Sequence, residues 1–223
     1  MNVTHLKDIA KIMTSEAYLK LIDADATIKD KRYIYLPKKF EYGKTFFYDK
    51  RHERPESGFV VLANDEFDIK YISFILNSII IAFYFCGNQL SKPVTLTLKK
   101  LSDIPLRDAD EDTMFFTGLC NRILQIIYTR LANNPGNEVY SFYCKVISEI
   151  RDALAMEHLT QPLFEKLDIH IIDKWIDLLL SKDDIMTIPE IVNTVLEDDN
   201  ELMNQIRKMR IVITNIGNLT SQK

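Results

Sequence analysis

Few residues in this chain have the types and spacing that catalysis or metal binding needs. It has four histidines, none of them at a metal-ligand spacing: His5, His52, His158 and His170. A phosphate-binding glycine-rich loop, a GxSxG turn and an HExxH helix are all absent from the sequence. We therefore predict no catalytic residue, no metal site and no cofactor.

One weaker pattern could still perform metal chemistry. Glu56 and Asp68 could hold Mg²⁺ while Lys70 supports an attacking water, as in a metal-dependent nuclease. That chemistry needs the second carboxylate and the lysine on a strand, whereas here they open a predicted helix. Asp68 also suits the start of a helix, where the helix dipole favours a carboxylate. The nuclease is thus the weaker alternative.

Basic residues are concentrated in residues 29–54, which hold nine Lys or Arg against four Asp or Glu. The whole chain has a formal net charge of −4, but residues 1–102 carry 16 basic and 12 acidic residues. Residues 103–223 carry 12 and 20. A local positive face on an acidic protein suits a polyanionic ligand at one site.

The composition is that of a globular protein. At 223 residues, the chain has room for one or two domains. Its three cysteines lie in apolar contexts without CxxC spacing, which favours reduced core residues and a cytoplasmic location. The first 20 residues mix charges among apolar positions, unlike a signal peptide. The apolar run 71–86 has 16 residues, fewer than the ~20 that a membrane-spanning helix needs, so no membrane contact is predicted.

The pattern of apolar residues predicts an α+β fold. Residues 1–22 have helical spacing with Thr4 as a possible N-cap, and the stretch to residue 63 is typical of strands and loops. A buried helix is predicted over 68–86 and a strand over 94–98, and Pro105 prevents helix continuation near the end of this unit. The first predicted domain, 1–110, is thus a mixed unit with a small sheet and a buried helix.

The second predicted domain, 111–223, is helical throughout. The sequence NNPGN at 133–137 and the stretch 181–187 interrupt its apolar stripes, and Pro189 suits the first turn of a helix. Residues 202–216 carry apolar residues spaced 4, 3, 4 and 3 apart. This two-heptad seam predicts docking on a partner or self-association.

The order of features from Lys31 to Leu106 resembles a known family. YLPKKF is followed by a basic stretch, then by DIKYISFILNSIIIAFYF and finally by TLTLKKLSDIPL. This order is similar to the target recognition domains of bacterial restriction–modification systems. The closest likeness is to the C-terminal specificity domain of N6-adenine DNA methyltransferases and to type I specificity subunits. Leu76-Asn77-Ser78 and Leu101-Ser102-Asp103-Ile104-Pro105 carry it, and residues 139–180 extend it more weakly.

The resemblance implies a protein that binds duplex DNA without transferring the methyl group itself. Neither a cofactor-binding methyltransferase domain nor its Asn/Asp-Pro-Pro-Tyr/Phe motif occurs, so the chain would be a lone specificity module or one end of a larger enzyme. The expected partner is a methyltransferase subunit or domain. The predicted DNA-binding residues are Lys38, Lys39, Lys44, Lys50, Arg51, Arg54, Asn88, Gln89 and Lys92.

Within that set, Arg51 and Arg54 are the best candidates for base contacts. Asn88, Gln89 and Lys92 are the second-best candidates. Asn77 and Ser78 are predicted to be structural, because polar groups in a buried helix need hydrogen-bond partners. Asn77 would tie the helix to the neighbouring loop or strand, and Ser78 would bond to its own helix. A non-catalytic helical protein-interaction module remains an alternative to DNA binding.

Overall fold

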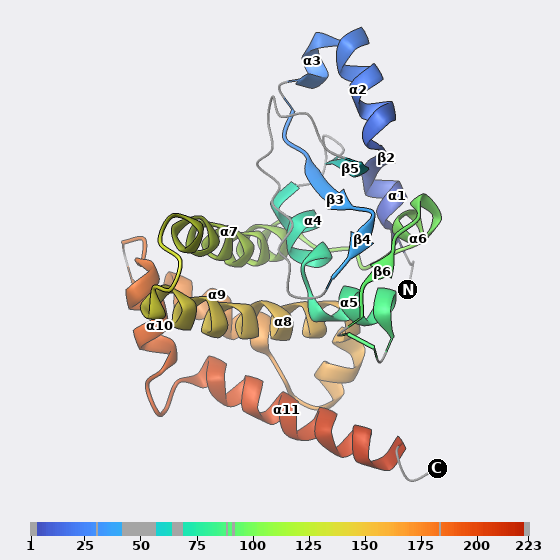
Figure 1. The fold of residues 1–223 in the computed structure, drawn as a ribbon. Coiled ribbons are helices and arrows are strands. Elements are labelled where there is room, and N and C mark those ends of the chain that lie inside the picture. The colour runs from blue at the N-terminus through green and yellow to red at the C-terminus, as the bar shows by residue number, and fades with distance from the viewer. Residues whose placement is uncertain are drawn as a thin grey trace. The chain divides into compact units, whose positions relative to one another are not determined.

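The computed structural model describes residues 4–29, 31–41, 57–63, 69–87, 89–90, 92–182 and 184–220, and it confirms the predicted α+β fold. The chain divides into two compact units, Met1–Gln125 (unit 1) and Ile126–Lys223 (unit 2). The division falls within a long helix, α7 (Glu111–Asn133), and the predicted domain boundary near residue 110 lies just before that helix. Figure 1 shows the strands in the first unit and long helices in the second.

Unit 1 contains small antiparallel sheets. Its strands are β1 (Thr4–His5), β2 (Ala10–Thr14), β3 (Ile34–Pro37), β4 (Lys39–Phe40), β5 (Gly58–Ala63), β6 (Val94–Thr95) and β7 (Pro105–Leu106). The largest sheet has the order β2-β5-β3, while β1 pairs with β7 and β4 pairs with β6. The central strand β5 is buried over most of its length, which is why its sequence GFVVLA is almost continuously apolar.

A hydrophobic cluster covers one face of the β2-β5-β3 sheet. Met13, Val60 and Leu62 from the sheet pack with Tyr18 and Tyr33, whose ring centroids are 4.9 Å apart. Tyr18 lies on α2 (Ser15–Ala24), so this helix closes that face. Alternate residues of β5 point to the opposite face, and α4 (Ile69–Leu76) packs against that strand.

The continuous helix predicted from the spacing in residues 1–22 is wrong. The segment instead folds as β1, a short α1 (Leu6–Ile9), β2 and α2, followed by α3 (Ala26–Lys29). Thr14 caps α2 by accepting a hydrogen bond from the Ala17 N–H at 3.2 Å, whereas Thr4 lies in β1. Residues 10–14 pair with β5 along their whole length, and this tertiary pairing overrides the helical spacing.

Two further predictions need correction. The helix expected over 68–86 is two helices, α4 and α5 (Ile79–Cys86), separated at Asn77 and Ser78. The strand expected over 94–98 ends at Thr95, because Thr97 caps α6 (Leu98–Ser102) by accepting from the Lys100 N–H. A β-branched residue with a side-chain oxygen suits a strand and an N-cap equally well, so the pattern alone does not place the boundary.

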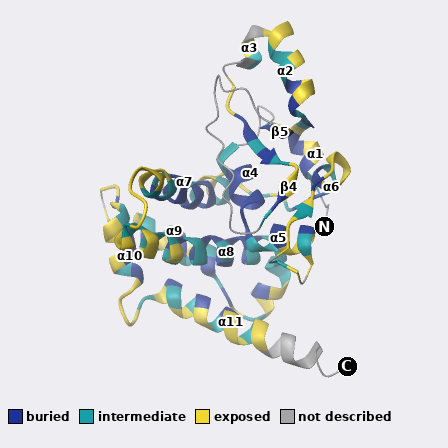
Figure 2. Cartoon of the chain, in the orientation of Figure 1, coloured by how far each residue is buried: buried dark blue, intermediate teal, exposed yellow. Residues whose placement is uncertain are grey.

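Unit 2 is helical, as predicted. Its helices after α7 are α8 (Glu138–Lys166), α9 (Ile171–Leu180), α10 (Ile188–Val195) and α11 (Glu201–Thr220). Pro189 lies in the first turn of α10, and a capping box joins Thr187 to Glu190. Helix α8 packs against α9, α10 and α11, and Figure 2 shows dark buried positions along α8.

The predicted seam of α11 is partly used inside unit 2. Leu202, Ile206 and Met209 are buried, and α11 packs against α8 and α9. Farther along the helix, Ile213 is 39 % exposed. Any self-association through 202–216 would therefore depend on the C-terminal part of the seam, and it stays a prediction.

Candidate nucleic-acid interface and a buried polar network

The predicted DNA-binding residues fall into described and undescribed groups. Lys38, Lys39, Gln89 and Lys92 are all exposed in the structure. Lys39 begins β4, and Gln89 and Lys92 lie in the connection from α5 to β6. The remaining predicted residues lie outside the described part of the chain: Lys44, Lys50, Arg51, Arg54 and Asn88.

Pairing of β4 with β6 brings two separate stretches of the sequence together. Lys39 lies opposite Thr95, and the Leu96 N–H donates to the Lys38 carbonyl at 2.8 Å. Both Lys39 and Thr95 are exposed, whereas the next residue, Phe40, is buried. Lys38 and Lys39 therefore stand opposite Leu96 and Thr95, and Lys92 precedes the strand β6 that carries Thr95.

Aromatic packing holds the inner side of the β4–β6 ribbon. The ring of Phe40 lies 5.0 Å from the ring of Phe85 on α5 in an edge-to-face arrangement. Such pairs contribute about 0.5–1.5 kcal/mol beyond the area that they bury. The contact fixes the α5 side of the ribbon and leaves Lys39 on the other side, where a phosphate backbone could reach it.

Two further exposed lysines, Lys99 and Lys100 on α6, were not among the predicted site residues. Burial raises the pKa of the Cys86 thiol at the end of α5, and the positive charge of Lys100 opposes this rise. The Tyr84 hydroxyl donates to the Asp103 carbonyl at 3.2 Å and ties α5 to the end of α6. The sequence signal was the Lys-Lys pair directly after the predicted strand.

Asn77 and Ser78 form the break between α4 and α5, which are bent by 55° relative to each other. Asn77 Nδ2 donates to the Ser73 carbonyl at 2.7 Å and to Ser73 Oγ at 3.2 Å. Ser78 Oγ accepts from the Ile81 N–H and caps α5. Asn121 Nδ2 on α7 donates to the same Ser73 Oγ at 2.9 Å. Asn77 and Ser78 thus end one helix and start the next, while Ser73 and Asn121 join α4 to α7. The hydrogen bonds of the Asn77 amide to Ser73 lie within α4, whereas a tie to the neighbouring loop or strand was predicted.

Of the three residues of the nuclease hypothesis, the structure describes Lys70 alone. Glu56 and Asp68 lie outside the described residues, and Lys70 lies half-buried in the first turn of α4. Over the described parts of the chain, no group of His, Cys, Asp and Glu side chains has the arrangement of a metal site. The structure therefore adds no support to metal chemistry at Lys70.

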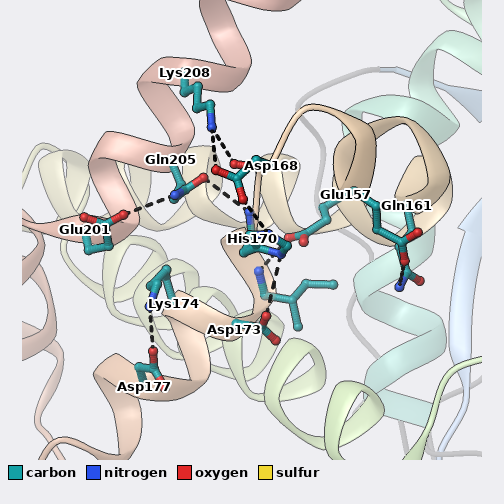
Figure 3. A network of polar contacts seen from close by, with 12 residues as sticks. Glu157, Gln161, Asp168, His170, Asp173, Lys174, Asp177, Glu201, Gln205 and Lys208 are labelled. Atoms are coloured by element: carbon teal, nitrogen blue, oxygen red, sulfur yellow. Dashed lines mark hydrogen bonds and ion pairs between the residues drawn. The ribbon is translucent and has the colours of Figure 1, made fainter.

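A second polar site lies in unit 2, where α8, α9 and α11 meet (Figure 3). Glu157 on α8 is 6 % exposed and accepts a hydrogen bond from the Ile172 N–H, 2.6 Å from Oε2. Burial raises the pKa of Glu157 to about 7, although hydrogen bonds from the Ile172 and Ile171 backbone lower it. Asp173 raises this pKa further by repulsion, while His170 lowers it.

The turn before α9 is tied to α11. Asp168 has a positive φ of 53°, and Lys208 Nζ lies 2.5 Å from its carbonyl and 3.4 Å from its Oδ2. Hydrogen bonds from Lys208 and His170 keep the pKa of Asp168 below its usual value. The His170 N–H donates to Gln205 Oε1 at 3.2 Å, and Gln205 in turn contacts Glu201 (Figure 3).

The arrangement around His170 does not fit acid–base catalysis. Its Nε2 lies 3.2 Å from Asp168 Oδ1, and its Nδ1 lies 3.8 Å from Asp173 Oδ2. Both ring nitrogens thus face carboxylates of neighbouring residues, so neither is directed at a substrate. The network joins three helices, and we interpret it as structural.

Comparisons of the chain with protein-family models, with curated proteins and with solved structures found no match. Among the described residues, no single helix has the length and apolar composition to cross a membrane. The bent pair α4 and α5, taken together, meets those two criteria by length and composition alone.

Proposed function

We propose that the chain is a DNA sequence-recognition module of a bacterial restriction–modification methyltransferase. It would bind duplex DNA in the cytoplasm without catalysing methyl transfer. The observation that carries the proposal is the pairing of β4 with β6, which joins the stretch of exposed Lys38 and Lys39 to the stretch that follows exposed Lys92. Exposed lysines hold phosphates and set the register of a protein on DNA.

The resemblance of residues 31–106 to target recognition domains supports the choice of duplex DNA among polyanions. In this proposal the lysines bind the backbone, and base contacts come from Arg51 and Arg54, with Asn88, Gln89 and Lys92 as the second set of candidates. Unit 2, which belongs to the acidic half of the chain, does not favour DNA and instead binds the methyltransferase subunit or domain. The methyl donor would belong to that partner.

The experiment is a titration of a mixed pool of duplex DNA at several salt concentrations. The test variant replaces Lys38, Lys39 and Lys92 by Ala. The control variant replaces three exposed lysines elsewhere, Lys20, Lys145 and Lys166. Each phosphate contact contributes about −0.9 to the slope of log K against log salt, so the test variant should flatten the slope by up to ~2.7. The control variant should keep the wild-type slope.

Absence of salt-dependent binding would favour a second candidate, a protein-interaction module. The observation behind it is the exposure of large apolar side chains in unit 2. They include Leu180 at 65 %, Ile185 at 98 % and Ile211 at 64 % exposed. Cleavage of the DNA with Mg²⁺ present would instead revive the nuclease.

A further inference from the structure

The N-terminus of α9 is capped by a carboxylate from another helix. His170, at the N-cap position, makes no side-chain capping hydrogen bond. Glu157 of α8 takes that role and accepts from the Ile172 N–H at 2.6 Å. Because the first N–H groups of a helix have no partner within it, this contact satisfies one donor and fastens α9 to α8.

The same turn is fastened to α11 by different chemistry. Lys208 binds the carbonyl and the carboxylate of Asp168, and Gln205 accepts from the His170 N–H. Asp168 and Lys208 have exposed side chains, whereas Glu157 is buried. Water solvates the charges at the α11 contact, whereas an ionised Glu157 carboxylate is buried and loses most of its hydration, which costs free energy.

The charged groups around Glu157 have opposite effects on its ionisation. Asp173, in the first turn of α9, repels the ionised carboxylate, and His170 at the N-cap favours it. Beyond them, α11 contributes Lys208, which is engaged by Asp168. Burial is the largest influence and raises the pKa of Glu157 from 4.5 to about 7.

We propose that Glu157 makes the α8–α9 joint proton-linked: burying its ionised carboxylate costs more than the hydrogen bond from the Ile172 N–H offsets, so unit 2 is more stable when Glu157 is protonated than when it is ionised. A group whose pKa is higher in the folded state contributes stability that is present at low pH. That contribution is lost as the pH rises through the folded-state pKa. The joint should therefore loosen as the pH rises from about 5 to 8, the range set by the shift of Glu157.

The chain provides a built-in reporter of this joint. Trp175 is the single tryptophan of the sequence, lies on α9 and is fully buried. Its emission during urea unfolding therefore follows the environment of α9. We would compare pH 5 with pH 8 for the full chain and for two variants, Glu157→Gln and His170→Gln.

Between pH 5 and pH 8, the unfolding constant of the wild type should rise by up to roughly seventyfold, because the pKa of Glu157 is higher in the folded than in the unfolded state. The Gln side chain at 157 keeps an oxygen for the Ile172 N–H but does not titrate, so Glu157→Gln should remove most of this dependence. Histidine also titrates near neutral pH, which makes His170→Gln the matched control. That control should retain the larger part of the dependence.

An equal pH dependence in the wild type and in Glu157→Gln would overturn the proposal, as would a wild type that shows none. If Glu157→Gln does not fold, Asp173→Asn provides a second test. Without the repulsion from Asp173, the pH at which the unfolding constant stops rising should be lower in the variant than in the wild type. If that pH is the same in both, a group other than Glu157 causes the pH dependence, and the proposal is overturned.

Discussion

The hydroxyl of Ser73 joins two helices of unit 1, and its removal tests the energetics of that joint. Ser73 is fully buried, and its Oγ accepts from Asn77 Nδ2 at 3.2 Å and from Asn121 Nδ2 at 2.9 Å. In a Ser73→Ala variant, Asn77 keeps its shorter bond to the Ser73 carbonyl. Asn121, which is 2 % exposed, loses the acceptor for its amide.

The size of the effect follows from these partners. A buried donor left without an acceptor costs about 1–3 kcal/mol. Alanine in a helix offsets this by about 0.5 kcal/mol relative to serine. We therefore expect a net loss of about 0.5–2.5 kcal/mol, because the orphaned amide outweighs the gain in helix propensity.

Hydrogen exchange followed by mass spectrometry measures this loss locally. Peptides that cover α4 and the part of α7 around Asn121 should exchange about 2 to 70 times faster in the variant, the equivalent of about 0.5–2.5 kcal/mol. Ser15→Ala is the matched control, because Ser15 is also buried but its Oγ has no hydrogen-bond partner among the described residues. Its replacement should be neutral or slightly stabilising.

A double variant separates the contact from a general packing effect. Ser73→Ala with Asn121→Leu removes donor and acceptor together, which costs less than leaving one of them orphaned. If Ser73→Ala exchanged like the wild type, or if Ser15→Ala lost as much stability, the assignment of the cost to the Asn121 amide would be refuted.

Two other substitutions should act locally. Gly58→Ala would place a Cβ too close to the Leu36 carbonyl oxygen and the Tyr35 ring, so the β3–β5 pairing must shift. We expect the free energy of unfolding in urea to fall by about 1–3 kcal/mol. An unchanged urea midpoint would contradict this. In α10, hydrogen bonds from the Thr187 backbone and hydroxyl lower the pKa of Glu190 to about 2. This contribution is present above pH 4.5 and is lost as the pH falls toward 2, so amide exchange in α10 should accelerate over that range, less so in Thr187→Val.

The helical second half of the chain could be predicted because its signals are local. The NNPGN sequence ends α7 and precedes α8, and Pro189 with Thr187 marks the start of α10. Such breaks and caps depend on a few adjacent residues, so no tertiary information is needed. The helix break at Ser78 was missed because its capping serine is embedded in an apolar run that reads as one helix.

The first half depends on pairings between distant residues. Residues 10–14 have helical spacing, yet they form β2 because they pair with β5. Likewise, Lys39 and Lys92 could each be named from the sequence, but the pairing of their two stretches comes from two-residue strands whose register no local pattern encodes. Lys99 and Lys100 were overlooked because residues 97–98 were assigned to a strand and not to the start of α6.

The strand pairings of unit 1 also determine when it can fold. Thr4 pairs with Leu106 and Thr14 pairs with Phe59, so each sheet closes only after a long stretch of chain has been made. Closing such loops is entropically costly, and folds rich in distant contacts form slowly. A ribosome must therefore extend the chain past Leu106 before β1 finds its partner. Until then the apolar segments that become α4 and α5 lack part of their cover, and this is the interval in which a chaperone would matter most.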